Sequence, residues 1–184
     1  MITGEKTYLA VVERTDTEQL RTWRNMPELR QYFREYREIS TEMQDKWFTE
    51  RVCGNRDQVD FGIHDLSTGE LIGHCGLYYI DWVSRNAELA VYLGSQYHRG
   101  RGYGVDALRL LFDYGFLTLG LHRVWCEVFD GNAAVDVYRH LGFRDEGVKR
   151  QHHFDGGRFI DSLMLGLLSS EWQSGHSAHI EQSQ

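Results

Sequence analysis

A glycine- and arginine-rich stretch holds the residues of this sequence that are best suited to binding a ligand. It reads Tyr97-His-Arg-Gly-Arg-Gly-Tyr-Gly-Val105 and lies where a predicted strand ends and a long predicted helix begins. Glycines let the main chain turn sharply and approach a ligand, and the first amides of a helix lack intrahelical partners, which suits a phosphate or pyrophosphate. Arg99 and Arg101 add positive charge at the same place. A strand-to-helix turn with surface arginines is the alternative interpretation.

Two common phosphate-binding motifs are excluded by the spacing of these glycines. No Gly-Lys-Ser/Thr follows Gly102 and Gly104, so the stretch is not the phosphate loop of nucleotide hydrolases. The dinucleotide fingerprint would require a third glycine where the chain has Asp106 or Ala107. The prediction is therefore an anion-binding turn for some other phosphorylated cofactor.

The segments before this loop predict a mixture of helices and strands. Residues 7–13 are β-prone, and Thr15-Asp-Thr-Glu18 has the spacing of a capping box that opens a helix. A short helix is expected at 28–33, and a second capping box, Thr41-Glu-Met-Gln44, predicts another. From residue 58 the hydrophobic period changes to two, which indicates strands. These strands are expected at 59–64, 71–80 and 87–93.

The segments after the loop complete the expected fold. Apolar residues recur at helical spacing between Gly102 and Gly120, which predicts a long amphipathic helix. Strands are then expected at 123–129, 143–151 and 159–167, with a helix at 133–140. The last two strands would pair across Asp155-Gly-Gly157. The fold class is α+β, with a mixed, mostly antiparallel sheet of six to seven strands flanked by helices and a strand–helix–strand crossover at its centre.

Length and composition indicate one folded domain. The chain has 184 residues, of which 41% are hydrophobic, and Pro27 is its single proline, so no proline-rich linker divides it. We expect this domain to cover residues 1–172. Residues 173–184 are polar and are expected to form a disordered tail.

Charge, cysteine content and hydropathy narrow the class of protein. The formal net charge of −7 argues against a nucleic-acid partner and is compatible with a cationic substrate such as an amine. Cys53, Cys75 and Cys126 are isolated, which suits a reducing cytoplasm. The sequence contains neither a signal-peptide pattern nor an apolar run long enough to cross a bilayer, so we expect a cytoplasmic protein with no membrane partner. A monomer and a homodimer both remain open.

Two motifs in order resemble the GNAT superfamily of N-acetyltransferases. The cofactor loop of that family reads Gln/Arg-x-x-Gly-x-Gly/Ala, and this chain has Arg99-Gly-Arg-Gly102-Tyr-Gly104. A later family helix ends in a tyrosine shortly before Leu-Gly-Phe, and this chain has Tyr138-Arg-His-Leu-Gly142-Phe143. The stretches Trp23-Arg24-Asn25 and Ala87-Glu88-Leu89 are similar to the branch that acetylates ribosomal-protein amino termini, diamines and nucleotide-linked amino sugars.

The resemblance implies an N-acetyltransferase that uses acetyl-CoA as its co-substrate. The residues it assigns to the cofactor are Leu93, Arg99, Gly100, Arg101, Gly102, Tyr103, Gly104 and Asn132. The family often has an asparagine seven residues before the tyrosine, but that position here is Gly131. Asn132 therefore either contacts the pantetheine arm or caps the helix that begins at Ala133.

The resemblance also implies direct transfer without an acyl-enzyme. A protonated amine must lose a proton before it attacks the thioester, and the leaving thiolate gains from receiving one. Tyr138 is expected to be the general acid near the sulfur. Glu88, on the strand before the cofactor loop, is the candidate base acting through water, with a solvated surface charge as the alternative. Cys126 is interpreted as a packing residue.

The acceptor amine is the least determined part of the prediction. A protein or peptide amino terminus is favoured, with a polyamine or an amino sugar as alternatives, and a non-catalytic acetyl-CoA-binding domain as the rival class. Arg24, Asn25, Tyr32 and His153 are the expected substrate-binding residues. His152, beside His153, has no second ligand pair at metal-binding spacing, so no metal is expected.

Overall fold

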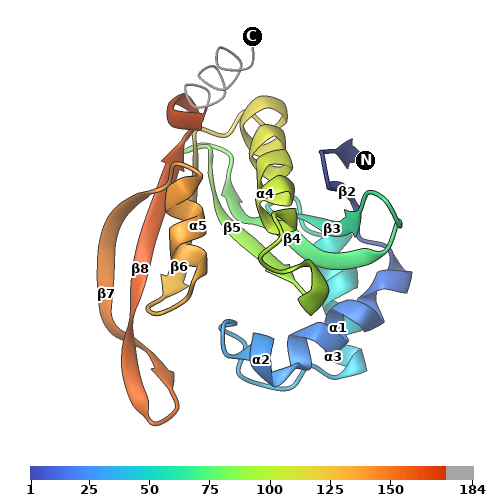
Figure 1. Cartoon of the computed structure of the whole chain (residues 1–184), viewed down its shortest axis with the longest axis horizontal. Coiled ribbons are helices and arrows are strands. Elements are labelled where there is room, and N and C mark those ends of the chain that lie inside the picture. The colour runs from blue at the N-terminus through green and yellow to red at the C-terminus, as the bar shows by residue number, and fades with distance from the viewer. Residues whose placement is uncertain (173–184) are drawn as a thin grey trace. The chain divides into compact units, whose positions relative to one another are not determined.

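The computed structural model describes residues 1–172, and the polar segment 173–184 lies outside the described residues (Figure 1). Eight strands are hydrogen-bonded in the order β1-β2-β3-β4-β5-β6-β8-β7, one or two more than the sequence predicts. The additional strand is β1 (Ile2–Thr3), which pairs with β2 (Thr7–Val11). The remaining strands follow the predicted order, so the mixed α+β class is confirmed.

The chain forms two compact units. The first consists of Met1–Tyr79 and Leu89–Leu111, and the second consists, within the described residues, of Ile80–Glu88 and residues 112–172. Two strands, β4 (Leu71–Asp81) and β5 (Asn86–Leu93), contribute residues to both units.

The first unit is built on an antiparallel meander. β2 pairs with β3 (Val59–Asp65), and β3 pairs with β4. Its helices are α1 (Thr17–Asn25), α2 (Pro27–Arg30), α3 (Thr41–Trp47) and most of α4 (Tyr103–Asp113). The amphipathic pattern of α1 places Leu20 and Trp23 in an apolar cluster with Val12, Leu29 and Phe48. Figure 1 shows α1, α2 and α3 gathered near one another.

The starts of these helices differ from the predicted capping boxes. α3 is capped by Ser40, whose hydroxyl accepts a hydrogen bond from the Met43 amide at 3.2 Å, so the cap lies one residue before the predicted Thr41. Before α1, the carboxylate of Asp16 accepts a hydrogen bond from the Glu13 amide at 2.8 Å and closes a 3-10 turn. α1 therefore begins at Thr17, inside the predicted box, with Asp16 and not Thr15 at the N-cap position.

One close approach in the first unit requires a glycine. A Cβ atom on Gly94 would lie 1.8 Å from the ring of Trp23, so no other residue fits between β5 and α1. Packing of Trp23 against this glycine brings α1 directly onto the chain that leads into the glycine- and arginine-rich loop.

The second unit begins with a parallel strand pair. Asn86, Ala87 and Glu88 of β5 pair with Arg123, Val124 and Trp125 of β6 (Arg123–Phe129), as the predicted crossover requires. β6 then pairs antiparallel with β8 (Arg158–Leu168), which pairs with β7 (Arg144–Asp155). These last two strands form the long hairpin seen in Figure 1, and Asp155 pairs with Arg158 across the predicted turn.

Helical segments pack this unit around a buried aromatic side chain. α5 (Ala134–His140) matches the predicted helix, and the π-helical segment Tyr114–Thr118 follows α4. Phe112 is fully buried, with the Phe143 ring centroid at 5.5 Å and that of Trp172 at 5.3 Å. No helix within residues 1–172 is long and apolar enough to cross a membrane.

Candidate active site

The predicted cofactor loop lies in the first unit, between a 3-10 turn at Gln96–His98 and α4. Gly100 and Gly102 have φ values of 70° and 88°, in the left-handed region that side chains rarely occupy. The Asp106 amide donates to the Gly102 carbonyl at 3.0 Å and closes the first turn of α4. The amides just before it form the positive end of an eleven-residue helix, and they fit a pyrophosphate.

The charges around this loop differ in part from the sequence prediction. The guanidinium of Arg99 donates to the carbonyls of Leu93 and Gly94, both at 3.0 Å, so it ties the loop to the end of β5. Arg101 lies over the Tyr97 ring at 4.0 Å. The ammonium of Lys6 donates to the Arg101 carbonyl at 2.8 Å. Lys6 thus brings a third positive charge to the loop, from a position in the sequence where no local pattern indicates it.

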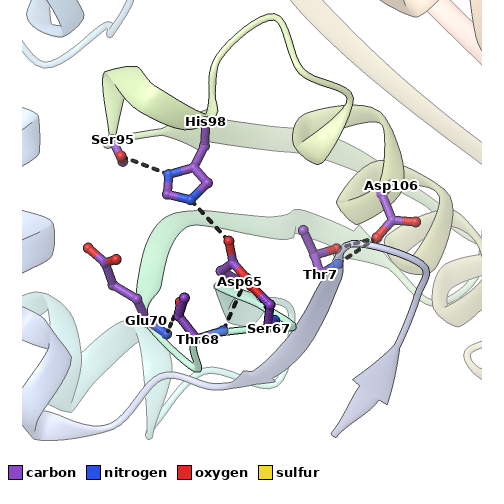
Figure 2. A network of polar contacts seen from close by, with 8 residues as sticks. All are labelled: Thr7, Asp65, Ser67, Thr68, Glu70, Ser95, His98 and Asp106. Atoms are coloured by element: carbon purple, nitrogen blue, oxygen red, sulfur yellow. Dashed lines mark hydrogen bonds and ion pairs between the residues drawn. The ribbon is translucent and has the colours of Figure 1, made fainter.

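A buried histidine and aspartate support the loop from the β3–β4 turn (Figure 2). His98 Nε2 lies 3.1 Å from Asp65 Oδ2, and His98 Nδ1 lies 2.8 Å from the Ser95 hydroxyl. Asp65 also accepts hydrogen bonds from the amide and hydroxyl of Ser67 and the amide of Thr68. The Ser67 hydroxyl makes the largest contribution to lowering the pKa of Asp65 well below its usual value, against the effect of burial.

A second carboxylate, that of Asp106, anchors the start of α4 to the chain at residues 5–7. Asp106 accepts hydrogen bonds from the amides of Glu5 and Lys6 at 3.1 and 3.0 Å. It also accepts hydrogen bonds from the amide and the hydroxyl of Thr7 at 2.8 and 2.7 Å, which Figure 2 shows. Burial raises the pKa of Asp106, but these hydrogen bonds together lower it below its usual value. The loop is therefore held between two anionic anchors within one unit.

The candidate base, Glu88, is buried in the second unit. Its residue is 5% exposed, and it pairs with Trp125 in the parallel β5–β6 register. Paired residues share a sheet face, and alternation places Glu127 on that face and Cys126 on the other. The alternative of a solvated surface charge is therefore wrong for Glu88, while its role as a base stays a prediction.

The candidate acid, Tyr138, lies on the Cys126 side of the same unit. Its residue is 7% exposed, and its ring centroid is 5.5 Å from that of Phe143. Burial raises the pKa of the Tyr138 phenol well above its usual value, and the neighbouring Cys126 adds to the effect. The hydroxyl therefore keeps its proton at neutral pH, as a proton donor must. Tyr138 and Glu88 thus lie on opposite faces of the β5–β6 pair.

Asn132 has the capping contact that the sequence left as one of two alternatives. Its side-chain oxygen accepts a hydrogen bond from the Ala134 amide at 2.9 Å, at the start of α5. Gly131, at the position where the resembled family has its asparagine, has a φ of 83°. The contact between Asn132 and the cofactor remains a prediction.

The four predicted substrate-binding residues lie in different settings. In the first unit, Arg24 lies over the Phe33 ring at 4.7 Å, and its buried Nε has no hydrogen-bond partner among residues 1–172. Asn25 Oδ1 accepts a hydrogen bond from the Ile39 amide at 2.8 Å, and Asn25 Nδ2 donates one to the Ile39 carbonyl at 2.9 Å. The side chain of Asn25 therefore stabilises the main chain at Ile39. Tyr32 is 48% exposed.

The fourth residue, His153, belongs to the second unit. Its ring stacks on Phe129 with the centroids 3.7 Å apart. Within residues 1–172, no three His, Cys, Asp or Glu side chains are grouped as metal ligands would be.

The first unit also contains a hollow of about 520 Å³ beside α1. Its charged lining residues are Asp16, Glu28 and Glu70, and Gly94 and Gln96 from the chain before the cofactor loop complete that side. A hollow whose charged groups are carboxylates favours a cationic ligand.

Comparison with known proteins identifies the family. Residues 7–144 match the acetyltransferase (GNAT) domain, which is more than half of the chain. The chain therefore belongs to the GNAT acetyltransferases, enzymes that use acetyl-CoA as their co-substrate, as the two sequence motifs predict.

Several relatives carry names that bear on the substrate. The chain is 36% identical over 113 residues to an uncharacterized N-acetyltransferase, p20, from Bacillus licheniformis, a match that covers 61% of this chain and 63% of that protein. It is 30% identical over 129 residues to spermidine N(1)-acetyltransferase from Escherichia coli K12, covering 65% and 69%. A crystal structure of spermidine N-acetyltransferase from Vibrio cholerae with CoA and spermine aligns with a TM-score of 0.84 and 26% identity, covering 91% and 98%.

The substrates named for these relatives differ from the acceptor that the sequence favours. The sequence favours a protein or peptide amino terminus as the acceptor, whereas these named relatives are spermidine acetyltransferases. The reason for the difference is that acceptor binding depends on loops, which vary while the scaffold is retained.

Proposed function

We propose that this protein transfers the acetyl group of acetyl-CoA to a primary amine of a polyamine such as spermidine or spermine. The observation that carries the proposal is the alignment with the Vibrio cholerae spermidine N-acetyltransferase over 91% of this chain. The net charge of −7 and the carboxylates of the hollow beside α1 support a substrate with several positive charges.

The cofactor would be held by the loop before α4. The left-handed glycines Gly100 and Gly102 let the main chain approach the pyrophosphate, and the start of α4, with Lys6 and Arg101, supplies positive potential. A Cβ on Gly100 would meet no atom within 4 Å, so the space above this turn is open to a ligand. Acetyl-CoA supplies the thioester on which the transfer takes place.

Two side chains of the second unit divide the proton transfers. Glu88 would accept a proton from the ammonium through water, and the neutral nitrogen would then attack the thioester carbonyl. Tyr138 would donate its proton to the departing thiolate and regain one from the nitrogen as the amide forms. The burial of Tyr138, which keeps its phenol protonated, supports the role of donor, and the burial of Glu88 within the parallel β5–β6 pair supports a carboxylate in a restricted environment.

A panel of amines tests the proposal directly. Thiol release from acetyl-CoA would be followed with spermidine, spermine, an amino sugar and a peptide that has a free amino terminus. The highest kcat/KM is expected for a polyamine, because its several ammonium groups can each contact a carboxylate. Release with the amino sugar alone would overturn the polyamine assignment, and silence with every amine would favour a binding domain without transferase activity.

A second acceptor has a specific observation in its favour. The chain is 31% identical over 109 residues to a putative ribosomal N-acetyltransferase, YdaF, from Bacillus subtilis, covering 59% of each protein. A peptide amino terminus is therefore the second candidate, and preferential release with the peptide would support it over the polyamine.

A further inference from the structure

A buried carboxylate in the second unit binds two basic side chains. Glu127 of β6 has a side chain that is only 4% exposed. Its Oε2 lies 2.7 Å from the Lys149 ammonium, and its Oε1 lies 2.7 Å from His152 Nδ1. Both partners come from β7, which is separated from β6 in the sheet by β8. They therefore reach across β8 to the same carboxylate.

The backbone of β7 is distorted where it brings these partners together. Lys149 and His152 are three positions apart, so regular alternation would place them on opposite faces of the sheet. The register with β8 shifts between Lys149 and His153, and Gln151 has a φ of 51°. A glutamine in the left-handed conformation costs on the order of 1 kcal/mol. The Asp161 carboxylate stabilises this conformation of Gln151 by accepting a hydrogen bond from its main-chain amide at 2.7 Å. This bulge directs the side chain of His152 toward the carboxylate of Glu127.

The partners of His152 define which of its ring nitrogens is available. Nδ1 faces the Glu127 carboxylate at 2.7 Å and the Ser162 hydroxyl at 3.3 Å. The contact with Glu127 is an ion pair by distance and not an aligned hydrogen bond, but a carboxylate can only accept, so we infer that Nδ1 carries the proton and that Nε2 carries the lone pair. The side chain of His152 is 47% exposed, in contrast to its buried partner. An imidazole oriented by a carboxylate in this way is suited to accepting a proton at Nε2.

The pair shares a sheet face with the candidate base. Glu88 pairs with Trp125, and Glu127 lies two residues further along β6 on the same face. Two residues along a strand correspond to about 7 Å. We propose that His152, oriented by Glu127, is a further proton-transfer residue that receives, through water, the proton that Glu88 takes from the substrate ammonium. This inference rests on the proposed amine acetylation.

The proton of the ammonium reaches solvent through two side chains. The ammonium loses the proton through water to Glu88, the proton passes through water to His152 Nε2, and Glu127 stabilises the resulting imidazolium. The nitrogen lone pair then forms the bond to the thioester carbonyl carbon, and the carbon–sulfur bond breaks. The nitrogen loses a second proton as the amide forms, which compensates for the proton that the thiolate takes up. The imidazolium finally releases its proton to solvent, which can reach His152 because its side chain is partly exposed. The ionisable side chains around this step are Glu127 on β6, Lys149 on β7 and Asp161 on β8.

The kinetic test compares His152→Gln with the parent protein across pH. Spermidine is the substrate, or the amine of the panel that the parent acetylates if spermidine is left unchanged. We expect His152→Gln to lower kcat about 100-fold near neutral pH, with a smaller loss at alkaline pH where more amine is already neutral, and with partial rescue by added imidazole. Glu127→Gln should lower kcat in the same direction. The exposed His140 of α5 provides the matched control, and His140→Gln should keep the parent profile.

Two results would overturn the inference. One is a His152→Gln enzyme with the pH–rate profile of the parent, and the other is a uniform loss that neither alkaline pH nor imidazole reduces, since that would indicate a structural role. The protein alone gives a separate readout: nitrogen-15 NMR should find neutral His152 protonated at Nδ1 in the parent, and finding it protonated at Nε2 would also overturn the inference. A parent that acetylates no amine would instead overturn the proposed function and this step together.

Discussion

The carboxylate of Asp106 accepts hydrogen bonds from both the amide and the hydroxyl of Thr7, at 2.8 and 2.7 Å, although the two residues are 99 positions apart. This contact fastens the first turn of α4 to the beginning of β2. Because α4 starts immediately after the cofactor loop, the stability of the loop depends on a carboxylate that must remain ionised.

The first prediction concerns acid stability. The pKa of Asp106 is lowered in the folded state, so its contribution to stability is present above the unfolded pKa of about 4 and is lost as pH falls toward the folded value. Asp106→Asn should cost about 2 kcal/mol at pH 7 and should show a smaller further loss of stability on acidification than the parent. Urea unfolding at pH 7 and at mildly acid pH measures both quantities.

The matched control is Asp136→Asn, because the Asp136 side chain is 89% exposed. It should change the free energy of unfolding by less than about 0.5 kcal/mol. If Asp106→Asn lost as much stability on acidification as the parent, the ionised anchor would not be responsible.

The second prediction separates backbone strain from cofactor binding. Gly102→Val places a β-branched residue at a φ of 88°, in the loop expected to hold the pyrophosphate. Gly120→Val introduces comparable strain at a φ of 67°, at a position that does not belong to the loop. Each should cost about 1–3 kcal/mol of stability, but only Gly102→Val should weaken acetyl-CoA binding, by about tenfold or more. Calorimetric titration measures both affinities. Equal affinities for the two variants would remove the loop from cofactor binding.

The third prediction concerns the proton donor. Tyr138→Phe keeps the buried ring beside Phe143 and removes only the hydroxyl. Turnover should fall about 100-fold, while the affinity for acetyl-CoA changes little, because the hydroxyl acts on the departing sulfur. Steady-state kinetics and calorimetry provide the two measurements. Tyr79→Phe, at a residue that is 66% exposed, should leave both unchanged. Normal turnover by Tyr138→Phe would contradict its role as the acid.

The fourth prediction concerns the proton acceptor on the other face. Glu88→Gln keeps the size of the side chain and removes its charge, so the rate should fall most at low and neutral pH and recover partly as the amine deprotonates in alkaline solution. A rate–pH profile of the variant beside the parent checks this. If the two profiles had the same shape, Glu88 would be a substrate contact or a structural charge.

Regular elements with a clear hydrophobic period were predictable from the sequence. The bounds of β6, Arg123–Phe129, agree with the expected strand, and α5 differs from the expected helix by one residue. The two-residue strand β1 was missed because it is too short to show a period of two. α4 was expected to continue to Gly120, but it gives way to a π-helical segment at Tyr114, which apolar spacing alone cannot distinguish from α-helix.

The site was predictable only where a local motif exists. The cofactor loop and Tyr138 could be proposed from the sequence because each belongs to a run of neighbouring residues. Lys6 was missed because its contact with the Arg101 carbonyl joins positions 95 residues apart. The pairing of Glu127 with His152 was missed because it depends on a bulge, and strict alternation places Lys149 and His152 on opposite faces.

The acceptor is tested most directly by a competition between two amines in one reaction. Equal concentrations of spermidine and a peptide with a free amino terminus would be incubated with the protein and limiting acetyl-CoA, and the products would be identified by mass spectrometry. The proposed function predicts that most of the acetyl group is found on spermidine and that Tyr138→Phe abolishes most of that product. Acetylation of the peptide in preference to spermidine would contradict the polyamine assignment.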